Sequence, residues 1–397
     1  MLYYHKRPCG LGARGLRGGN TKGDDSLSTL QELIRYCGEE ERLGALLLTG
    51  EWGCGKTHLI EKDLAEALRS THDIVRVSLF SVDSVTALSG AVKRQWIRTC
   101  TPLLGRLDRK NERVRKNGLF HAISTLLMYS NTVGGSVASA IASVDPVEYI
   151  SLDTLIDEYY KRGEQKRIVL VFDDLSRSRL DLNQLVGAIN EYCENRRFAT
   201  IVIAQDAFIK SVLAEDPGLY KMIREKTISR SVRYMPDYRA IIHSIITGGK
   251  WPGAEYAAFL KENEQVVYDA LVSDSAERQG TLGKYHNLRS MSCALRDFAR
   301  LYDLMAEREP PYIAQYLYTF IAYTLVSRNG VSKNGQPSFE VEDAEMKQLY
   351  PRYSTELMPE SIRQWAEFGV WEEDEIVRDI SDHEKRTHAA DAAPGRP

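Results

Sequence analysis

Cysteine is sparse in this sequence, and the few cysteines that occur are scattered. The 397 residues hold six of them, and no two form a C-x-x-C pair. Disulfide frameworks and zinc sites both need cysteines at close, repeated spacings. We therefore expect reduced thiols, as in a cytoplasmic protein, and no zinc centre.

Neither a charge of one sign nor a long hydrophobic run dominates the chain. Lysine and arginine total 52 against 55 aspartates and glutamates, a net charge of −3. The molecule as a whole should therefore not attract nucleic acid electrostatically. The N-terminus lacks the apolar core of a signal peptide, so we do not expect secretion. With 43% hydrophobic residues, the composition is that of a globular protein with a large domain and one or two smaller units.

The most informative segment is Gly50–Thr57, which fits the pattern G-x-x-x-x-G-K-[ST] without a mismatch. In this phosphate loop the backbone N–H groups surround the phosphates, the lysine reaches the β- and γ-phosphates, and the hydroxyl holds Mg²⁺. An apolar run before the loop and an amphipathic helical pattern after it supply the strand–loop–helix context that the motif requires. We therefore predict ATP and Mg²⁺ as cofactors. The residues predicted to bind them here are Gly50, Glu51, Trp52, Gly53, Cys54, Gly55, Lys56, Thr57 and His58.

A second motif ends in two carboxylates. Residues 168–172 have the pattern of a buried strand, and Asp173 and Asp174 follow directly. Downstream of a phosphate loop, this is the form of a Walker B element. Asp173 is predicted to hold, through water, the Mg²⁺ that Thr57 also binds, and Asp174 to orient the attacking water. Lys56 and Asp174 are thus predicted catalytic residues. Many ATPases have glutamate where Asp174 stands, so the shorter side chain needs a closer approach or a helper.

Polar residues also follow the strand pattern 199–204, where Gln205 and Asp206 come next. In P-loop ATPases of the additional-strand class, this strand lies between the strands that carry the two motifs above. A polar residue at its tip therefore faces the γ-phosphate. Either residue could do so, and we favour Asp206 as a catalytic sensor.

The order of elements predicts an α/β fold, a parallel sheet of the P-loop type with helices on both faces. A capping box at Ser28–Gln31 predicts the start of a short helix before the first strand. Past Pro236 only helices are expected, and apolar residues from Leu288 to Met305 repeat at spacings of three and four, which indicates a buried helix face. We expect this helical unit to be a lid. The predicted strands are 45–49, 74–80, 167–172, 199–204 and 231–234.

We divide the chain into four parts. Residues 1–26 are a flexible, basic, glycine-rich arm, and 27–236 form the P-loop core. Residues 237–382 form the helical lid and a C-terminal helical region. The polar residues 383–397 are expected to be a disordered tail.

The stretch 81–165 is far longer than the helix that normally joins two parallel strands. We interpret it as a long helical insert between Walker A and Walker B. Its first part, 93–116, holds nine lysines and arginines, whereas 119–143 has no charged residue but nine Ser, Thr, Asn or His residues. That polarity does not suit a membrane span, which needs about 20 apolar residues, so we do not expect one. The basic part is a candidate nucleic-acid contact, although Trp96 is its only aromatic residue for base stacking.

Together these motifs resemble the KAP family of P-loop NTPases. The resemblance covers about 27–310 and implies an ATPase of the additional-strand division with a helical lid, often found in bacterial mobile-element and anti-phage loci. Ser176 replaces the acid of the family's D-D-L-D-R, and the insert lacks convincing membrane spans. The segments that carry the resemblance are Gly50–Thr57, Asp173–Arg177, Ile203–Asp206, Glu225-Lys226 and Asn287–Arg289.

Two arginines gain catalytic roles by analogy. Arg289 begins the lid helix and is predicted to reach the γ-phosphate as a sensor. Arg230, just before the last strand, is predicted to serve a neighbouring subunit as an arginine finger. Arg224 and Lys226 compete for that finger role.

The leading function is an ATP-driven conformational switch that acts through a protein partner or self-assembly, with antiviral defence as its setting. The alternative is a nucleotide-gated scaffold with little or no catalysis, which Ser176 and the aspartate at 174 favour. A small-molecule kinase fits less well, because no compact arginine-rich acceptor lid follows the sheet. A nucleic-acid motor would depend on 93–116.

Overall fold

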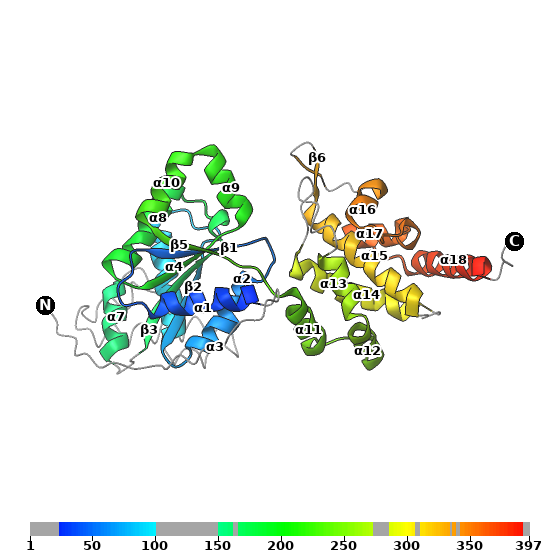
Figure 1. Ribbon diagram of the computed structural model, residues 1–397, viewed down its shortest axis with the longest axis horizontal. Coiled ribbons are helices and arrows are strands. Elements are labelled where there is room, and N and C mark those ends of the chain that lie inside the picture. Colours follow the sequence, from blue (N-terminus) through cyan, green and yellow to red (C-terminus); the bar gives the residue numbers. More distant parts are fainter. Residues whose placement is uncertain are drawn as a thin grey trace, which may run out of the picture.

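The computed structural model describes residues 24–100, 150–161, 166–272, 286–305, 310–333, 336–338 and 342–391. Figure 1 shows two lobes, an α/β lobe that ends with β5 and a helical lobe that begins with α11. The α/β lobe contains α1 (Asp24–Gly38), β1 (Ala45–Thr49), α2 (Lys56–His58), α3 (Ala65–Leu68), β2 (His72–Ser78), α4 (Val85–Cys100), α7 (Leu152–Lys161), β3 (Arg167–Asp173), α8 (Leu182–Asn190), β4 (Ala199–Ile203), α9 (Asp206–Glu215), α10 (Pro217–Lys226) and β5 (Ile228–Arg233). The helical lobe contains α11 (Tyr238–Gly248), α12 (Ala254–Glu262), α13 (Glu264–Val272), α14 (Leu288–Leu304), α15 (Pro310–Asn329), β6 (Val331–Lys333), β7 (Gln336–Ser338), α16 (Asp343–Leu349), α17 (Glu360–Phe368) and α18 (Glu373–Asp391).

The sheet has five parallel strands in the order β2-β3-β4-β1-β5. All five predicted strands are confirmed, with ends that differ by no more than three residues. β4 lies between the phosphate-loop strand β1 and the carboxylate-bearing strand β3, as the additional-strand class requires. The tips of β1, β3 and β4 therefore meet at one edge of the sheet, where ligands of open α/β sheets bind.

Alternate residues of the central strands enter two separate apolar cores. Leu170 and Phe172 of β3 pack in the core that α4, α7 and α8 cover. Val169 and Val171 pack in the core that α1 and the helical residues 56–68 cover. This period of two is that of a strand buried on both sides. The prediction of helices on both faces is therefore confirmed.

The two ends of the predicted insert are part of the first of these cores. α4 and α7 both contribute buried side chains to it, and Trp96 lies edge-on to Tyr159 with ring centroids 5.9 Å apart. Trp96, the only aromatic residue of the basic part, is only 1% exposed, so it is a packing residue and is not available to stack on bases. Residues 101–149, which include most of the basic part and all of 119–143, lie outside the described residues.

Two helix ends differ from the expectation. α1 begins at Asp24, four residues before the predicted capping box, because two aspartates already favour a helix start there. α18 continues to Asp391, so residues 383–391 are helical rather than disordered. The polar composition of 383–391 masks a helical period that continues from the residues before them. Ile376, Ile380 and Glu384, spaced four residues apart on α18, are all buried.

The helical lobe has an apolar core of its own. The predicted stripe on α14 is buried in it, against α15 and the helices on either side. Leu295 and Phe298 are fully buried there, which confirms the prediction of a packed helix face. None of the helices in the described part of the chain combines the length and apolarity needed to cross a membrane.

Candidate nucleotide and metal site

The loop between β1 and α2 depends on glycine in two ways. Gly53 and Gly55 have φ angles of 72° and 98°, in the left-handed region that side chains with a Cβ disfavour. A Cβ on Gly53 would also lie 2.3 Å from Oδ1 of Asn287 in the helical lobe. The loop can thus bring its backbone N–H groups close to phosphates while the second lobe packs against it.

Lys56 is buried at the centre of this loop. Its Nζ donates to the carbonyl oxygens of Gly50 and Glu51, at 2.9 and 2.7 Å. Hydrogen bonds from an ammonium group to phosphate are stronger than those to a neutral carbonyl. The side chain is therefore positioned to exchange these carbonyls for phosphate oxygens.

The remaining predicted loop residues differ in their surroundings. Cys54 is buried, and burial raises the pKa of its thiol, so it behaves as a small apolar side chain. Trp52 is half exposed, and the Arg177 guanidinium lies 4.7 Å from its ring centroid. His58 is exposed on α2, next to Thr57. The loop therefore offers mainly its backbone and Lys56 to a ligand.

The two predicted metal ligands meet. Thr57 Oγ1 donates to Asp173 Oδ2 at 2.9 Å, although the residues are 116 positions apart. Hydroxyl and carboxylate oxygens suit Mg²⁺, which completes its shell with water and phosphate oxygens. Across the described residues, no group of three or more His, Cys, Asp or Glu side chains could hold a metal by itself. These donors therefore fit an ion that is shared with a nucleotide.

Arg76 on β2 contacts the same carboxylate oxygen and was not predicted. Its Nη1 lies 3.1 Å from Asp173 Oδ2, and its Nε lies 2.8 Å from Glu61 Oε1. The pairing of β2 with β3 sets Arg76 opposite Val171, two residues before Asp173, on the face that carries the phosphate-loop helix. No local pattern marks this arginine, because only the strand register brings it to the site.

Asp174 lies beside Asp173 but faces β2. Its backbone is left-handed, with φ 60° and ψ 40°, which is unusual for a residue with a Cβ. Ser78 Oγ donates to its Oδ2 at 3.0 Å, and Arg177 Nε lies 3.9 Å from its Oδ1. Ser78 and Arg177 are thus the polar groups positioned to help this short side chain.

Asp206 lies beside the phosphate loop. Its N–H donates to Gly50 O at 3.1 Å, and its carboxylate forms an ion pair of 2.8 Å with Arg233. Arg233, which was also not predicted, is paired with Thr49 across β1 and β5. The register of β5 against β1 brings Arg233 to the site, and no local pattern in the sequence marks it.

The N-terminus of α14, in the helical lobe, is in direct contact with the phosphate loop. The N–H of Leu288 donates to Gly53 O at 3.1 Å, and His286 Nδ1 lies 2.9 Å from Glu51 Oε2. Asn287 caps the helix, with its Oδ1 accepting the N–H groups of Arg289 and Ser290. Arg289 follows with an exposed side chain. The predicted sensor arginine is thus at the border between the loop and the lid.

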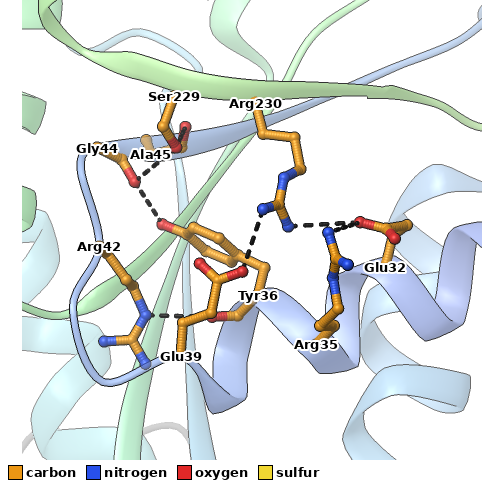
Figure 2. A network of polar contacts seen from close by, with 9 residues as sticks. All are labelled: Glu32, Arg35, Tyr36, Glu39, Arg42, Gly44, Ala45, Ser229 and Arg230. Carbon is orange, nitrogen blue, oxygen red and sulfur yellow. Dashed lines mark hydrogen bonds and ion pairs between the residues drawn. The ribbon is translucent and has the colours of Figure 1, made fainter.

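Arg230 lies elsewhere in the lobe. Figure 2 shows its guanidinium between Glu32 of α1 and Glu39, the residue after the end of that helix. The two ion pairs measure 3.4 and 3.1 Å. Arg230 is opposite Leu46, the second residue of β1, near the end of the strand that is farther from the loop. Because its charge is paired within its own chain, this placement gives no support to the arginine-finger role. Arg224 and Lys226 are exposed on α10.

Comparison with solved structures found weak overall likenesses. The Aeropyrum pernix ORC2 protein in its ADP form is 12% identical over 92% of this chain and 94% of its own, with a TM-score of 0.41. Its ADPNP–ADP complexes give 11% identity, the same coverages and a TM-score of 0.40. A structure of Drosophila ORC bound to GC-rich DNA and Cdc6 is 10% identical over 92% of this chain and 48% of its own, with a TM-score of 0.36. We draw no argument from scores this low.

Sequence comparison is more specific. A search of the curated proteins found no significant match. A family model, the KAP family P-loop domain, matches residues 27–229, just over half of the 397 residues. The matched region contains the phosphate loop, the Thr57–Asp173 pair and Asp206, whose geometry agrees with the motifs. The chain therefore belongs to the KAP family of P-loop NTPases.

Proposed function

We propose that this protein binds ATP with Mg²⁺ and hydrolyses it to drive a conformational switch between its lobes. The observation that carries the proposal is the contact between the phosphate loop and the start of α14. Leu288 donates to Gly53 O, and the donors for phosphate and metal, Lys56 and Thr57, lie in the same loop. A ligand that fills the loop therefore acts on the segment that attaches the lid.

Each side chain has a separate part in the reaction. Lys56 binds the β- and γ-phosphates, and Thr57 and Asp173 hold Mg²⁺, which neutralises charge on the phosphate oxygens. Asp174 orients the attacking water, with its carboxylate held by Ser78 and Arg177.

Two further groups respond to the γ-phosphate. Asp206 is held by Arg233 beside the loop. Arg289 supplies positive charge from the lid as negative charge develops on the transferred group.

Lys56→Ala tests the binding step. The variant should lose ATP–Mg²⁺ binding in calorimetry, because the main countercharge to the phosphates disappears. Lys62→Ala, a lysine of the same helical segment that lies outside the loop, is the control and should bind as the wild type does. Unchanged affinity in a folded Lys56→Ala variant would contradict the proposal.

A nucleotide-gated scaffold is the second candidate. The Asp174 carboxylate is already bonded to Ser78 and lies near Arg177, so each of its oxygens already has a polar group of the chain beside it and is less available to an attacking water. In that case ATP occupancy alone would organise a complex. Wild-type hydrolysis no faster than that of Asp174→Asn, with and without partners, would favour the scaffold.

The biological setting is a proposal that depends on the family. We propose that the switch acts on a protein partner or on further copies of the chain in bacterial antiviral defence. Cells that carry the native locus should then reduce phage plating, and cells with Lys56→Ala should not. Equal plating on both would contradict the defence role without affecting the biochemical proposal.

A further inference from the structure

We propose that Arg76 is a built-in competitor of Mg²⁺. Its guanidinium neutralises Asp173 when no ion is bound, and it must release Asp173 and keep only Glu61 as its partner when Mg²⁺ arrives. The inference rests on the proposed nucleotide function and adds a control over metal binding to it. It goes beyond the family motifs, because Arg76 belongs to none of them.

The first observation is that one carboxylate oxygen of Asp173 accepts hydrogen bonds from both Thr57 and Arg76. Asp173 Oδ2 accepts from Thr57 Oγ1 at 2.9 Å and from Arg76 Nη1 at 3.1 Å. This is the oxygen through which Thr57 and Asp173 would hold the ion together. The Asp173 side chain is only 7% exposed, and a buried carboxylate needs a countercharge. The arginine supplies one from within the chain.

The second observation is that Arg76 has another acceptor. Its Nε is bonded to Glu61 Oε1 at 2.8 Å, and Glu61 lies in the π-helical stretch Leu59–Leu64 that follows Thr57 by one residue. A guanidinium has five N–H donors, so Arg76 can leave Asp173 and keep a carboxylate partner. The two acids therefore share one cation, and Glu61 determines how readily Asp173 is released.

The consequence concerns the order of binding. A guanidinium and a divalent cation repel each other, and the repulsion is stronger near a poorly solvated carboxylate than in water. Arg76 should therefore lower the affinity for Mg²⁺, so that the ion is retained only when phosphate oxygens add their charge. Occupancy of the site by Mg²⁺ then depends on bound nucleotide, and Mg²⁺ alone does not displace Arg76 from Asp173.

The test is calorimetric titration of Mg²⁺ into the full chain preloaded with ADP. Arg76→Gln should tighten Mg²⁺ binding by about tenfold, the size expected for one nearby charge. Glu61→Gln should weaken it severalfold, because Arg76 then remains on Asp173. In the double variant the Glu61→Gln effect should vanish, since there is no arginine left to redirect. Arg69→Gln, whose ion pair with Glu66 is exposed on α3, is the matched control and should change nothing.

Arg76→Lys separates charge from side-chain geometry. It keeps the positive charge, so its Mg²⁺ affinity should stay closer to that of the wild type than to that of Arg76→Gln. Unchanged or weaker Mg²⁺ binding in Arg76→Gln would overturn the inference, and so would a Lys variant that behaves like Gln or a Glu61 effect that persists in the double variant. A wild-type protein that binds no ADP would instead contradict the proposed function itself.

Discussion

Asp173 and Asp174 are neighbours in the chain, yet their carboxylates have different surroundings. Asp173 is nearly buried and bonded to Thr57 and Arg76. Asp174 is about one-third exposed, and it turns away through a left-handed backbone toward Ser78. A buried, fully bonded carboxylate suits a metal ligand, whereas a partly solvated one can reach water. The backbone conformation at Asp174 therefore separates the two roles.

Asp174→Asn tests this separation. The amide keeps the shape but cannot accept a proton, so ATP hydrolysis should fall by about 10²–10⁴, as for a lost general base. ATP and Mg²⁺ should still bind. Asp173→Asn is the contrasting variant, in which Mg²⁺ binding itself should weaken. Equal loss of Mg²⁺ binding in both variants would contradict the division of roles.

Cys54 gives a residue-scale prediction about pH. Burial raises its thiol pKa, so the reactive thiolate is a minor form near neutral pH. Its alkylation by N-ethylmaleimide should be slower than that of the partly exposed Cys293. The rate should rise about tenfold per pH unit below the pKa, as the thiolate fraction does. Mass spectrometry of peptides after timed quenching measures both rates, and fast labelling of Cys54 at pH 7 would contradict its burial.

At the scale of elements, the contact between the phosphate loop and the start of α14 is the joint that connects the two lobes. Asn287 caps α14, and its side chain also donates to Asn329 on α15. The same side chain packs against Gly53. A shift of the phosphate loop therefore reaches two helices of the second lobe through one amide group.

Gly53→Ala should disrupt this joint. The new Cβ would meet Asn287 at 2.3 Å, and losing the cap costs about 1 kcal/mol. Backbone amides at the start of α14 should then exchange hydrogen roughly fivefold faster, since 1.4 kcal/mol corresponds to tenfold. Gly187→Ala is the control: nothing lies within 4 Å of its Cβ, and it should stabilise α8 by about 0.5–1 kcal/mol. Unaltered exchange in Gly53→Ala would show that the joint is not tight.

The sequence predicted the helices, strands and motifs better than the contacts between them. The strands, the phosphate loop and the acids at 173 and 174 were predictable because each depends on a local pattern. Arg76 and Arg233 were not, because strand register alone brings them to the site. The place of Arg230 near the last strand predicts an arginine finger by analogy, yet ion pairs with Glu32 and Glu39 hold it away from the loop. Contacts between distant segments leave no local signature in one sequence.

At the scale of the whole molecule, the apolar cores are divided between the lobes. Two cores flank the sheet, and one lies among α11–α18. None of these clusters of described residues extends across both lobes, so the lobes are joined mainly by polar and backbone contacts at the phosphate loop. Such a molecule can change the arrangement of its lobes without exposing a core.

Calorimetric unfolding should reflect this division. We expect two transitions, and ATP with Mg²⁺ should raise the midpoint of the one that belongs to the α/β lobe. At a free ligand concentration of 100 times Kd the stabilisation is about 2.7 kcal/mol. The Lys56→Ala variant should show both transitions and no shift. A single transition in the wild type that moves as a whole with ATP would mean that the lobes unfold as one cooperative unit.

The charged side chains on the two edge strands also affect how copies of this protein can associate. Among the described residues, β2 and β5 are the edge strands of the sheet, where a strand of another molecule could dock. Arg76 lies on one edge strand, and Arg230 and Arg233 lie on the other, with Arg230 tied to α1 as Figure 2 shows. A docking strand would have to desolvate these guanidinium groups, and such charges are a known defence against edge-to-edge aggregation. Growth of the sheet from one molecule into the next is therefore disfavoured.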